Sequence, residues 1–155
     1  MPATPETDAR GFSIDRTHFA IRLERLLDAP PQAVFDAWTR PEELSQWWDP
    51  AGAPLARCDI DLRVGGSFSF VPDAHPDMPF SGTYREIDAP SRLVFEAFGA
   101  LGTVSLHSAG NKTHLRVTIV CSSGEHLEQY IKMGVDVGTA QTLDNLVAFV
   151  RPKAA

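Results

Sequence analysis

The sequence predicts an α+β fold in which a curved antiparallel sheet wraps around a long C-terminal helix, with two short helices after the first strand. Three observations lead to this prediction. Apolar and polar residues alternate in several short segments between residues 60 and 120, as in half-buried strands. Apolar residues recur at helical spacing over residues 126–150. All three tryptophans lie within residues 34–50, on two short helical faces that need a broad apolar surface to cover them.

Chain length predicts one domain, because 155 residues suit a single hydrophobic core. Residues 1–16 are rich in proline, threonine and acidic residues and show no periodicity, so we expect a flexible leader there. The single domain is expected to span residues 17–152.

Composition excludes several classes of protein. The formal net charge of −6 and the pI of about 5.3 argue against a partner made of nucleic acid, which would need a basic surface for its phosphates. No apolar run reaches membrane-spanning length and no signal pattern opens the chain, so we expect a cytoplasmic protein without a membrane partner. Cys58 and Cys121 lack metal-site spacing and are interpreted as buried or half-buried thiols rather than a disulfide.

The first elements follow directly from the pattern. Residues 19–27 alternate as a strand with one buried face. Two short helices follow within residues 34–50. Thr39, Pro41 and Glu42 supply a hydroxyl cap, a first-turn proline and an acid, which together predict the start of the second helix.

A hairpin is predicted next, with residues 60–64 and 68–70 as its strands. Gly65 and Gly66 form its turn, since a tight turn needs positive φ angles. Ile60, Leu62 and Val64 would share the buried face. The prolines of residues 72–79 then predict a loop.

Residues 80–87 and 92–97 form the next predicted pair of strands. Gly82 in the middle of the first strand indicates a close approach by another backbone or by a ligand. The face occupied by Glu96 has two interpretations. It points inward if Val94 does, and outward if Leu93, Phe95 and Ala97 point inward; we favour the outward orientation.

The last predicted hairpin pairs residues 103–107 with residues 114–120. A symmetric loop places Leu106 opposite Leu115 and Val104 opposite Val117 on the inner side. His107 and His114 then face each other on the outer side. Two histidines do not make a structural zinc site, so we predict no metal.

The C-terminal helix is predicted to begin at residues 122–125. Its inner row contains Thr139 among apolar residues: Ile131, Val135, Leu143, Leu146 and Val150. Gly134 and Gly138 weaken this helix and predict a break or bend.

The chain resembles a known family over approximately residues 18–150. The resemblance is carried by Val34, Phe35, Ala37, Trp38, Thr39, Pro41, Glu42, Leu44, Trp47, Trp48 and Pro50, then by Asp61, Arg63, Gly65 and Gly66, by Gly82, Tyr84, Glu86 and Ile87, by residues 90–94, and by Gly138, Thr139, Leu143 and Leu146. This pattern is similar to proteins like the C-terminal domain of the activator of the 90-kDa heat-shock-protein ATPase. They belong to the START-like, or SRPBCC, helix-grip superfamily, which includes birch-pollen-allergen-like proteins. The resemblance implies a sheet of seven or so strands gripping the long helix, with a pocket between them.

Two departures from that family pattern matter. Thr139 stands where the family commonly has tryptophan, and the smaller side chain predicts a larger void between helix and sheet. The sequence also lacks the additional N-terminal domain of the eukaryotic co-chaperone, which disfavours a chaperone partner.

The leading functional hypothesis is a protein that binds a small apolar or aromatic molecule in this pocket. Such sites are mostly apolar with a few polar groups that fix orientation, here Tyr84, Thr139 and Thr142. Each candidate taken alone is more commonly a core residue. The candidate ligand-binding residues are Trp38, Trp47, Phe68, Phe70, Tyr84, Phe95, Leu106, Val117, Thr139, Thr142 and Leu143.

Two alternatives remain open. One is a protein-interaction module that acts like the chaperone ATPase activator. The other is an enzyme of the cyclase or hydratase type, for which Glu96 and Tyr84 are the only candidate ionisable groups in the pocket. No hydrolase, zinc-protease or nucleotide-binding motif occurs, so we name no catalytic residue and no cofactor and lean against an enzyme. We expect a monomer or a homodimer.

Overall fold

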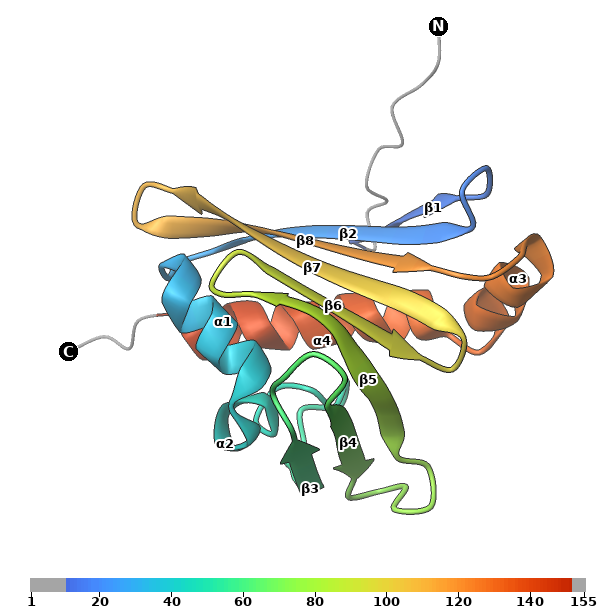
Figure 1. Cartoon of the computed structure of the whole chain (residues 1–155), viewed down its shortest axis with the longest axis horizontal. Coiled ribbons are helices and arrows are strands. Elements are labelled where there is room, and N and C mark those ends of the chain that lie inside the picture. The colour runs from blue at the N-terminus through green and yellow to red at the C-terminus, as the bar shows by residue number, and fades with distance from the viewer. Residues whose placement is uncertain (1–10, 152–155) are drawn as a thin grey trace, which may run out of the picture.

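The computed structural model describes residues 11–151 and shows a curved antiparallel sheet gripping a C-terminal helix (Figure 1). The sheet has eight strands in the order β1-β2-β8-β7-β6-β5-β4-β3. Their bounds are β1 Ser13–Asp15, β2 Ala20–Leu27, β3 Leu55–Ile60, β4 Ser67–Pro72, β5 Phe80–Asp88, β6 Arg92–Ala97, β7 Ala100–Ala109 and β8 Lys112–Val120. The predicted α+β helix-grip architecture is therefore confirmed.

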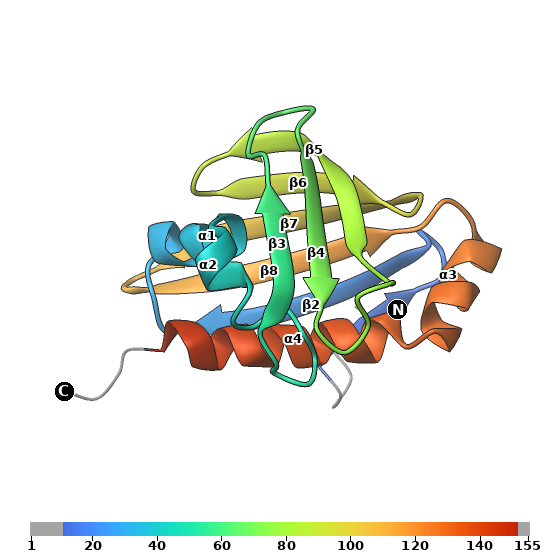
Figure 2. The same cartoon turned by 90° about the horizontal axis from the view of Figure 1, so that it is seen from below.

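Four helices accompany the sheet: α1 Pro31–Thr39, α2 Pro41–Leu44, α3 Gly124–Lys132 and α4 Val135–Val150. Helix α4 runs along one side of the curved sheet (Figure 2). Helices α1 and α2 lie near its C-terminal end, and α3 lies at its N-terminal end (Figure 1). The sheet and α4 thus form two layers, with α1 and α2 near one end of α4 and α3 at the other.

The predicted leader is partly structured. Residues 1–10 lie outside the described part of the chain, but Ser13–Asp15 forms edge strand β1, which pairs with the start of β2. The Asp15 carboxylate accepts hydrogen bonds from His18 and Arg22, at 2.7 and 3.1 Å. These contacts close the turn between β1 and β2.

The tryptophan-bearing corner forms as two helices, although the cap differs from the prediction. The residue before α2 is Arg40, and no side chain caps the helix. The hydroxyl of Thr39 instead donates to the carbonyl of Phe35 within α1, at 2.8 Å. Pro41 occupies the first turn of α2, as predicted.

The prediction for the strand before Gly65 is wrong in its bounds. Strand β3 ends at Ile60, and Leu62 and Val64 are exposed instead of sharing its buried face. The physical reason lies in β5. The Gly65 N–H donates to the carbonyl of Tyr84, and the Tyr84 N–H donates to the carbonyl of Gly66. These bonds hold the segment after Ile60 as a loop against β5.

Strands β5 and β6 agree with the favoured interpretation. A Cβ on Gly82 would lie 2.6 Å from the Phe68 ring and would also clash with the carbonyl of Glu96, so the predicted close approach is present. Leu93 and Ala97 are buried on β6, whereas Glu96 forms an ion pair with Arg85 on the neighbouring strand. Glu96 therefore lies on the outer face of the sheet.

The last hairpin has the predicted register. Leu106 pairs with Leu115, Val104 with Val117 and His107 with His114. The four aliphatic residues are buried and His107 is exposed. This register places the side chain of Val117 on the buried face of the sheet.

The C-terminal helical region breaks where glycine permits it. Gly134 separates α3 from α4 and has a φ of 80°, a left-handed conformation that favours glycine. Gly138 lies inside α4. The Ser123 side chain caps α3 by accepting from the His126 N–H at 3.1 Å, which confirms the predicted start.

Candidate ligand-binding site

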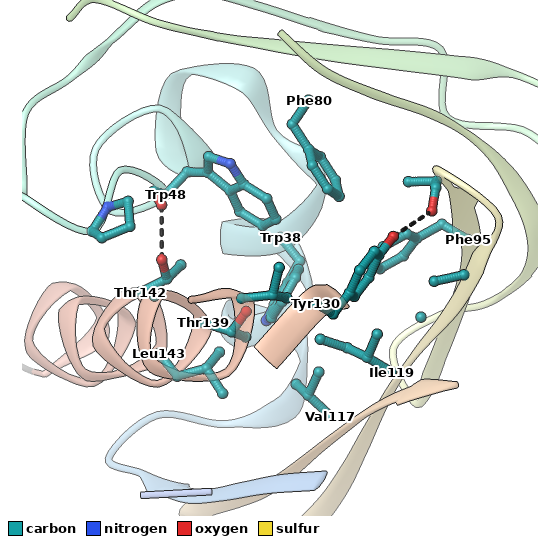
Figure 3. Close-up of a pocket in the computed structure, with 16 residues that line it drawn as sticks. Trp38, Trp48, Phe80, Phe95, Val117, Ile119, Tyr130, Thr139, Thr142 and Leu143 are labelled. Carbon is teal, nitrogen blue, oxygen red and sulfur yellow. Dashed lines mark hydrogen bonds between the residues drawn. The ribbon is translucent and has the colours of Figure 1, made fainter. Parts of the chain in front are cut away.

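A cavity of about 240 Å³ lies between the sheet and the C-terminal helices (Figure 3). It reaches from the tryptophan-bearing corner to α3. Strands β5 to β8 form one wall and α4 forms the opposite wall. The lining residues are Trp38, Trp48, Pro50, Phe80, Phe95, Ala97, Ala100, Gly102, Val117, Ile119, Tyr130, Val135, Gly138, Thr139, Thr142 and Leu143.

The cavity wall is apolar and aromatic. None of the lining residues within the described part of the chain is acidic, basic or histidine. Tyr130 is the only one with an ionisable side chain, and burial raises the pKa of its phenol. An occupant would therefore meet no charged group.

Most polar side chains around the cavity already have partners. Thr142 donates to the carbonyl of Trp48 at 3.0 Å, and the Tyr130 hydroxyl donates to the carbonyl of Phe98 at 3.2 Å. Asn145 adds a bond to the carbonyl of Asp49 at 3.0 Å. Thr142 and Asn145 thus fasten the segment after α2 onto α4, which explains how the corner comes to close one end of the cavity.

The two buried indoles differ in their hydrogen bonding. The Nε1–H of Trp47 donates to the carbonyl of Ala37 at 3.1 Å. The Nε1 of Trp38 is buried and has no hydrogen-bond partner within residues 11–151. The rings of Trp38 and Trp47 meet edge to face, with centroids 4.9 Å apart. Trp47 therefore supports the ring of Trp38 from outside the cavity.

A second aromatic cluster lies beside the cavity. Phe68, Phe70 and Phe80 stack on one another, and the Trp48 ring packs against Phe70 and Phe80 with centroids 4.9 and 5.2 Å apart. Only a void of about 10 Å³ remains between this cluster and Tyr84. The cluster is packed core, and only its outermost rings contact the main cavity.

The cavity brings together part of the predicted residue set. Trp38, Phe95, Val117, Thr139, Thr142 and Leu143 line it. Trp47, Phe68, Phe70, Tyr84 and Leu106 do not. Trp47 lies behind Trp38, Leu106 is buried on β7 at its pairing with Leu115, and the other three line the small void.

Sequence reasoning missed several lining residues. Trp48 and Ile119 could have been predicted from the sequence. Both are large apolar residues, one adjacent to Trp47 and the other two residues from Val117 on the same strand. Tyr130 lies on α3, which Gly134 separates from α4, so helical spacing along α4 does not predict which way its side chain points. Ala97, Ala100 and Gly102 also line the cavity, and their small side chains leave its volume unfilled.

Other candidate chemistry lies away from the cavity. Glu96 is paired with Arg85 on the outer face, and Tyr84 is buried in the aromatic cluster, where burial raises the pKa of its phenol. Cys58 and Cys121 are free, and burial raises the pKa of the Cys58 thiol to about 11. Neither ionisable candidate for an enzymatic role contacts the main cavity.

Residues 11–151 hold no group of three or more histidine, cysteine or acidic side chains suited to a metal ion. Within the same residues, every helix is too short or too polar to span a membrane.

The family model described as Activator of Hsp90 ATPase homolog 1-like protein matches residues 28–151. A comparison with curated proteins gives no match.

Solved structures share the fold. A protein of Nitrosomonas europaea has a TM-score of 0.77 and 23% identity, covering 89% of this chain and 97% of that one. A protein of Arthrobacter aurescens has a TM-score of 0.77 and 21% identity, covering 93% and 92%. A protein of Chromobacterium violaceum has a TM-score of 0.69 and 27% identity, covering 86% and 99%.

Proposed function

The chain belongs to the Activator of Hsp90 ATPase homolog 1-like family, and we propose that it binds a small, mostly apolar molecule in the cavity between its sheet and α4. The observation that carries this proposal is the cavity itself, which has a volume of about 240 Å³ and an aromatic and aliphatic wall. Empty space of this kind forfeits dispersion contacts along every wall, and an apolar occupant would restore them.

The cavity volume sets the size of the ligand. An engineered apolar cavity of roughly 150 Å³ in another protein binds benzene. Pockets for drug-sized ligands usually measure about 300–1,000 Å³. A cavity of about 240 Å³ lies between these values, so it suits one substituted ring or a short branched chain.

The small side chain of Thr139 on α4 also supports the proposal. It lines the cavity from α4, where a larger side chain would occupy the same space. Thr139→Trp therefore offers a variant that fills the cavity without altering the sheet. Val137→Trp is a matched control on the same helix, because Val137 is exposed and does not line the cavity.

Native mass spectrometry of freshly purified protein tests the proposal. We expect a co-purified small molecule, or one added from a set of monocyclic aromatic compounds, to give a one-to-one complex with the wild type and with Val137→Trp. The complex should be absent from a folded Thr139→Trp variant. Equal complex formation by all three proteins would place the binding elsewhere and refute the proposal.

A second candidate function is contact with a chaperone, in the manner suggested by the family's name. The observation in its favour is an exposed apolar pair, Leu101 and Val120, which are cross-strand partners at the end of the sheet near Phe19. Stimulation of a 90-kDa heat-shock-protein ATPase by the wild type, and its loss in Leu101→Lys, would support this role. No stimulation by the wild type would dispose of it.

A further inference from the structure

We infer that the ligand is a neutral molecule with an alcohol or phenol hydroxyl, and that this hydroxyl forms a hydrogen bond with the side chain of Thr139. The inference rests on the proposed function, because it specifies the chemistry of a ligand in the same cavity. It depends on three features of the cavity: one accessible hydroxyl without a partner, neighbouring polar groups that are bonded or out of reach, and a wall without charge.

The hydroxyl of Thr139 is a polar group that an occupant of the cavity can reach. Thr139 is half-buried and lines the cavity from α4, between Val135 and Leu143. Its hydroxyl forms no hydrogen bond within residues 11–151, and unlike the nitrogen of Trp38 it is not a buried atom. In Figure 3 it points from α4 toward the side of the cavity where Trp38 lies. A ligand in the cavity therefore contacts a free hydroxyl.

The other polar side chains of the cavity are bonded or out of reach. The Thr142 hydroxyl donates to the carbonyl of Trp48 at 3.0 Å, and the Tyr130 hydroxyl donates to a backbone carbonyl in the turn between β6 and β7 at 3.2 Å. The nitrogen of Trp38 is unpartnered but buried, so an occupant does not contact it. The nitrogen of Trp48 lies on the edge of its ring that faces away from Thr139 (Figure 3).

The sheet side of the cavity gives the ligand its orientation. Phe95 on β6 and Val117 and Ile119 on β8 line this side, and the other lining residues from the strands are also apolar. A ligand with one hydroxyl therefore places the hydroxyl on the helix side and its apolar part against the sheet. A pure hydrocarbon would gain the apolar contacts without this fixed orientation.

The chemistry of the wall selects a neutral hydroxyl. Among the described residues, no acidic, basic or histidine side chain lines the cavity, and an uncompensated buried charge is strongly unfavourable. This excludes carboxylates, phosphates and ammonium groups. A threonine hydroxyl can both donate and accept a hydrogen bond. An alcohol or phenol has the same two capacities, so the pair can form in either direction, whereas a ketone or an ether can only accept.

Thr139→Val is a suitable variant because valine has the shape of threonine, with a methyl group in place of the hydroxyl. The hydroxyl has no partner within the described residues, so its removal breaks no internal hydrogen bond. We expect Thr139→Val without ligand to be at least as stable as the wild type. Thr139→Ser retains the hydroxyl and serves as the conservative variant.

The test uses two probes of matched shape, benzyl alcohol and ethylbenzene, which differ by a hydroxyl in place of a methyl group. Isothermal titration calorimetry gives the affinity of each protein for both probes. Comparing each variant with the wild type cancels the difference in hydration between the probes. Thr139→Val should reduce the affinity for benzyl alcohol relative to ethylbenzene about three- to tenfold, the range expected for one hydrogen bond. Thr139→Ser should keep the wild-type ratio.

Thr118→Val is the matched control. It makes the same change of hydroxyl to methyl on β8, at a residue that does not line the cavity. The affinity ratio of the two probes should be the same in this variant as in the wild type.

A measurement on the wild type alone gives a second test. The methylene protons of bound benzyl alcohol should show nuclear Overhauser effects to the γ-methyl group of Thr139, and its ring protons should show them to the methyl groups of Val117 and Ile119. The reverse pattern would place the ligand hydroxyl at the sheet and overturn the inference.

The outcomes separate this inference from the proposed function. Binding of both probes with an unchanged affinity ratio in Thr139→Val would overturn the inference and leave the proposed function standing. An equal change of the ratio in Thr118→Val would also overturn it, because the effect would not come from the cavity. Failure of both probes to bind the wild type would count against both.

Discussion

Gly102 determines where the Phe95 ring lies. A Cβ at Gly102 would sit 2.5 Å from the tip of that ring, so the ring covers the glycine on the neighbouring strand. In Gly102→Ala the ring must turn away, and the cavity is the available space. We expect the free energy of unfolding to fall by about 1–3 kcal/mol, as in other overpacked cores, together with weaker ligand binding. Urea unfolding and a ligand titration measure the two effects.

Phe95→Leu in the Gly102→Ala background provides the control, because a smaller side chain relieves the clash. The double variant should regain part of the lost stability. A Gly102→Ala protein as stable as the wild type would mean that Phe95 does not rest on the glycine, and it would contradict the described packing.

Neighbouring residues show why site residues are hard to predict. Trp47 and Trp48 are adjacent, yet Trp47 is fully buried behind Trp38 while Trp48 lines the cavity. Helix α2 ends at Leu44, so helical spacing no longer decides which way the following side chains point. The fastening bonds from Thr142 and Asn145 set that direction, and they join residues almost one hundred positions apart.

Gly134 and Gly138, four residues apart, have opposite structural roles in the C-terminal helices. Gly134→Ala forces a side chain into the left-handed region at φ 80° and should lower the free energy of unfolding by about 1–2 kcal/mol. Gly138→Ala lies inside α4 and should raise it by up to about 1 kcal/mol through helix propensity. Thermal unfolding followed by circular dichroism measures both. Shifts of the same sign would contradict the assignment of the break to Gly134.

The turn between β1 and β2 should contribute stability that depends on pH. Hydrogen bonds from His18 and Arg22 lower the pKa of Asp15 from 3.8 to about 2. A lowered pKa in the folded state gives stability that is present above the unfolded pKa and is lost as the pH falls toward 2. Asp15→Asn should therefore be less stable than the wild type at pH 6, and the gap should close between about pH 4 and pH 2.

Melting temperatures of both proteins across this range give the result. The control is Asp28→Asn, an exposed acid at the other end of β2. A gap between wild type and Asp15→Asn that stays constant down to pH 2 would show that the carboxylate charge contributes nothing.

Alternation of apolar and polar residues predicted most strands correctly. It failed for residues 61–66, which alternate but form a loop held against β5. The hairpins around β5 to β8 follow from local patterns, including the pairing of Leu106 with Leu115. Residues 61–66 also alternate, but their backbone groups bond to Tyr84 in β5. No local pattern reveals a partner that is twenty residues away, so Leu62 and Val64 were assigned to a buried face that does not exist.

At the scale of the whole molecule, the sequence predicts the elements and their order, and the family resemblance predicts how they assemble. The cavity is less predictable, because it arises where side chains fail to fill space. Thr139 indicated its position on the helix. Its opposite wall depends on Ala97, Ala100 and Gly102, which a search for large apolar residues passes over.

Because the cavity wall is shared by α1, α3, α4 and four strands of the sheet, an occupant should stabilise the molecule as a whole. A ligand at one hundred times its dissociation constant adds about 2.7 kcal/mol to the free energy of unfolding. For a domain of 155 residues, this corresponds to a rise of roughly 5–10 °C in melting temperature. Differential scanning calorimetry with benzyl alcohol should show this rise in the wild type and none in Thr139→Trp. An equal rise in both proteins would mean that the stabilising site lies outside the space beneath α4.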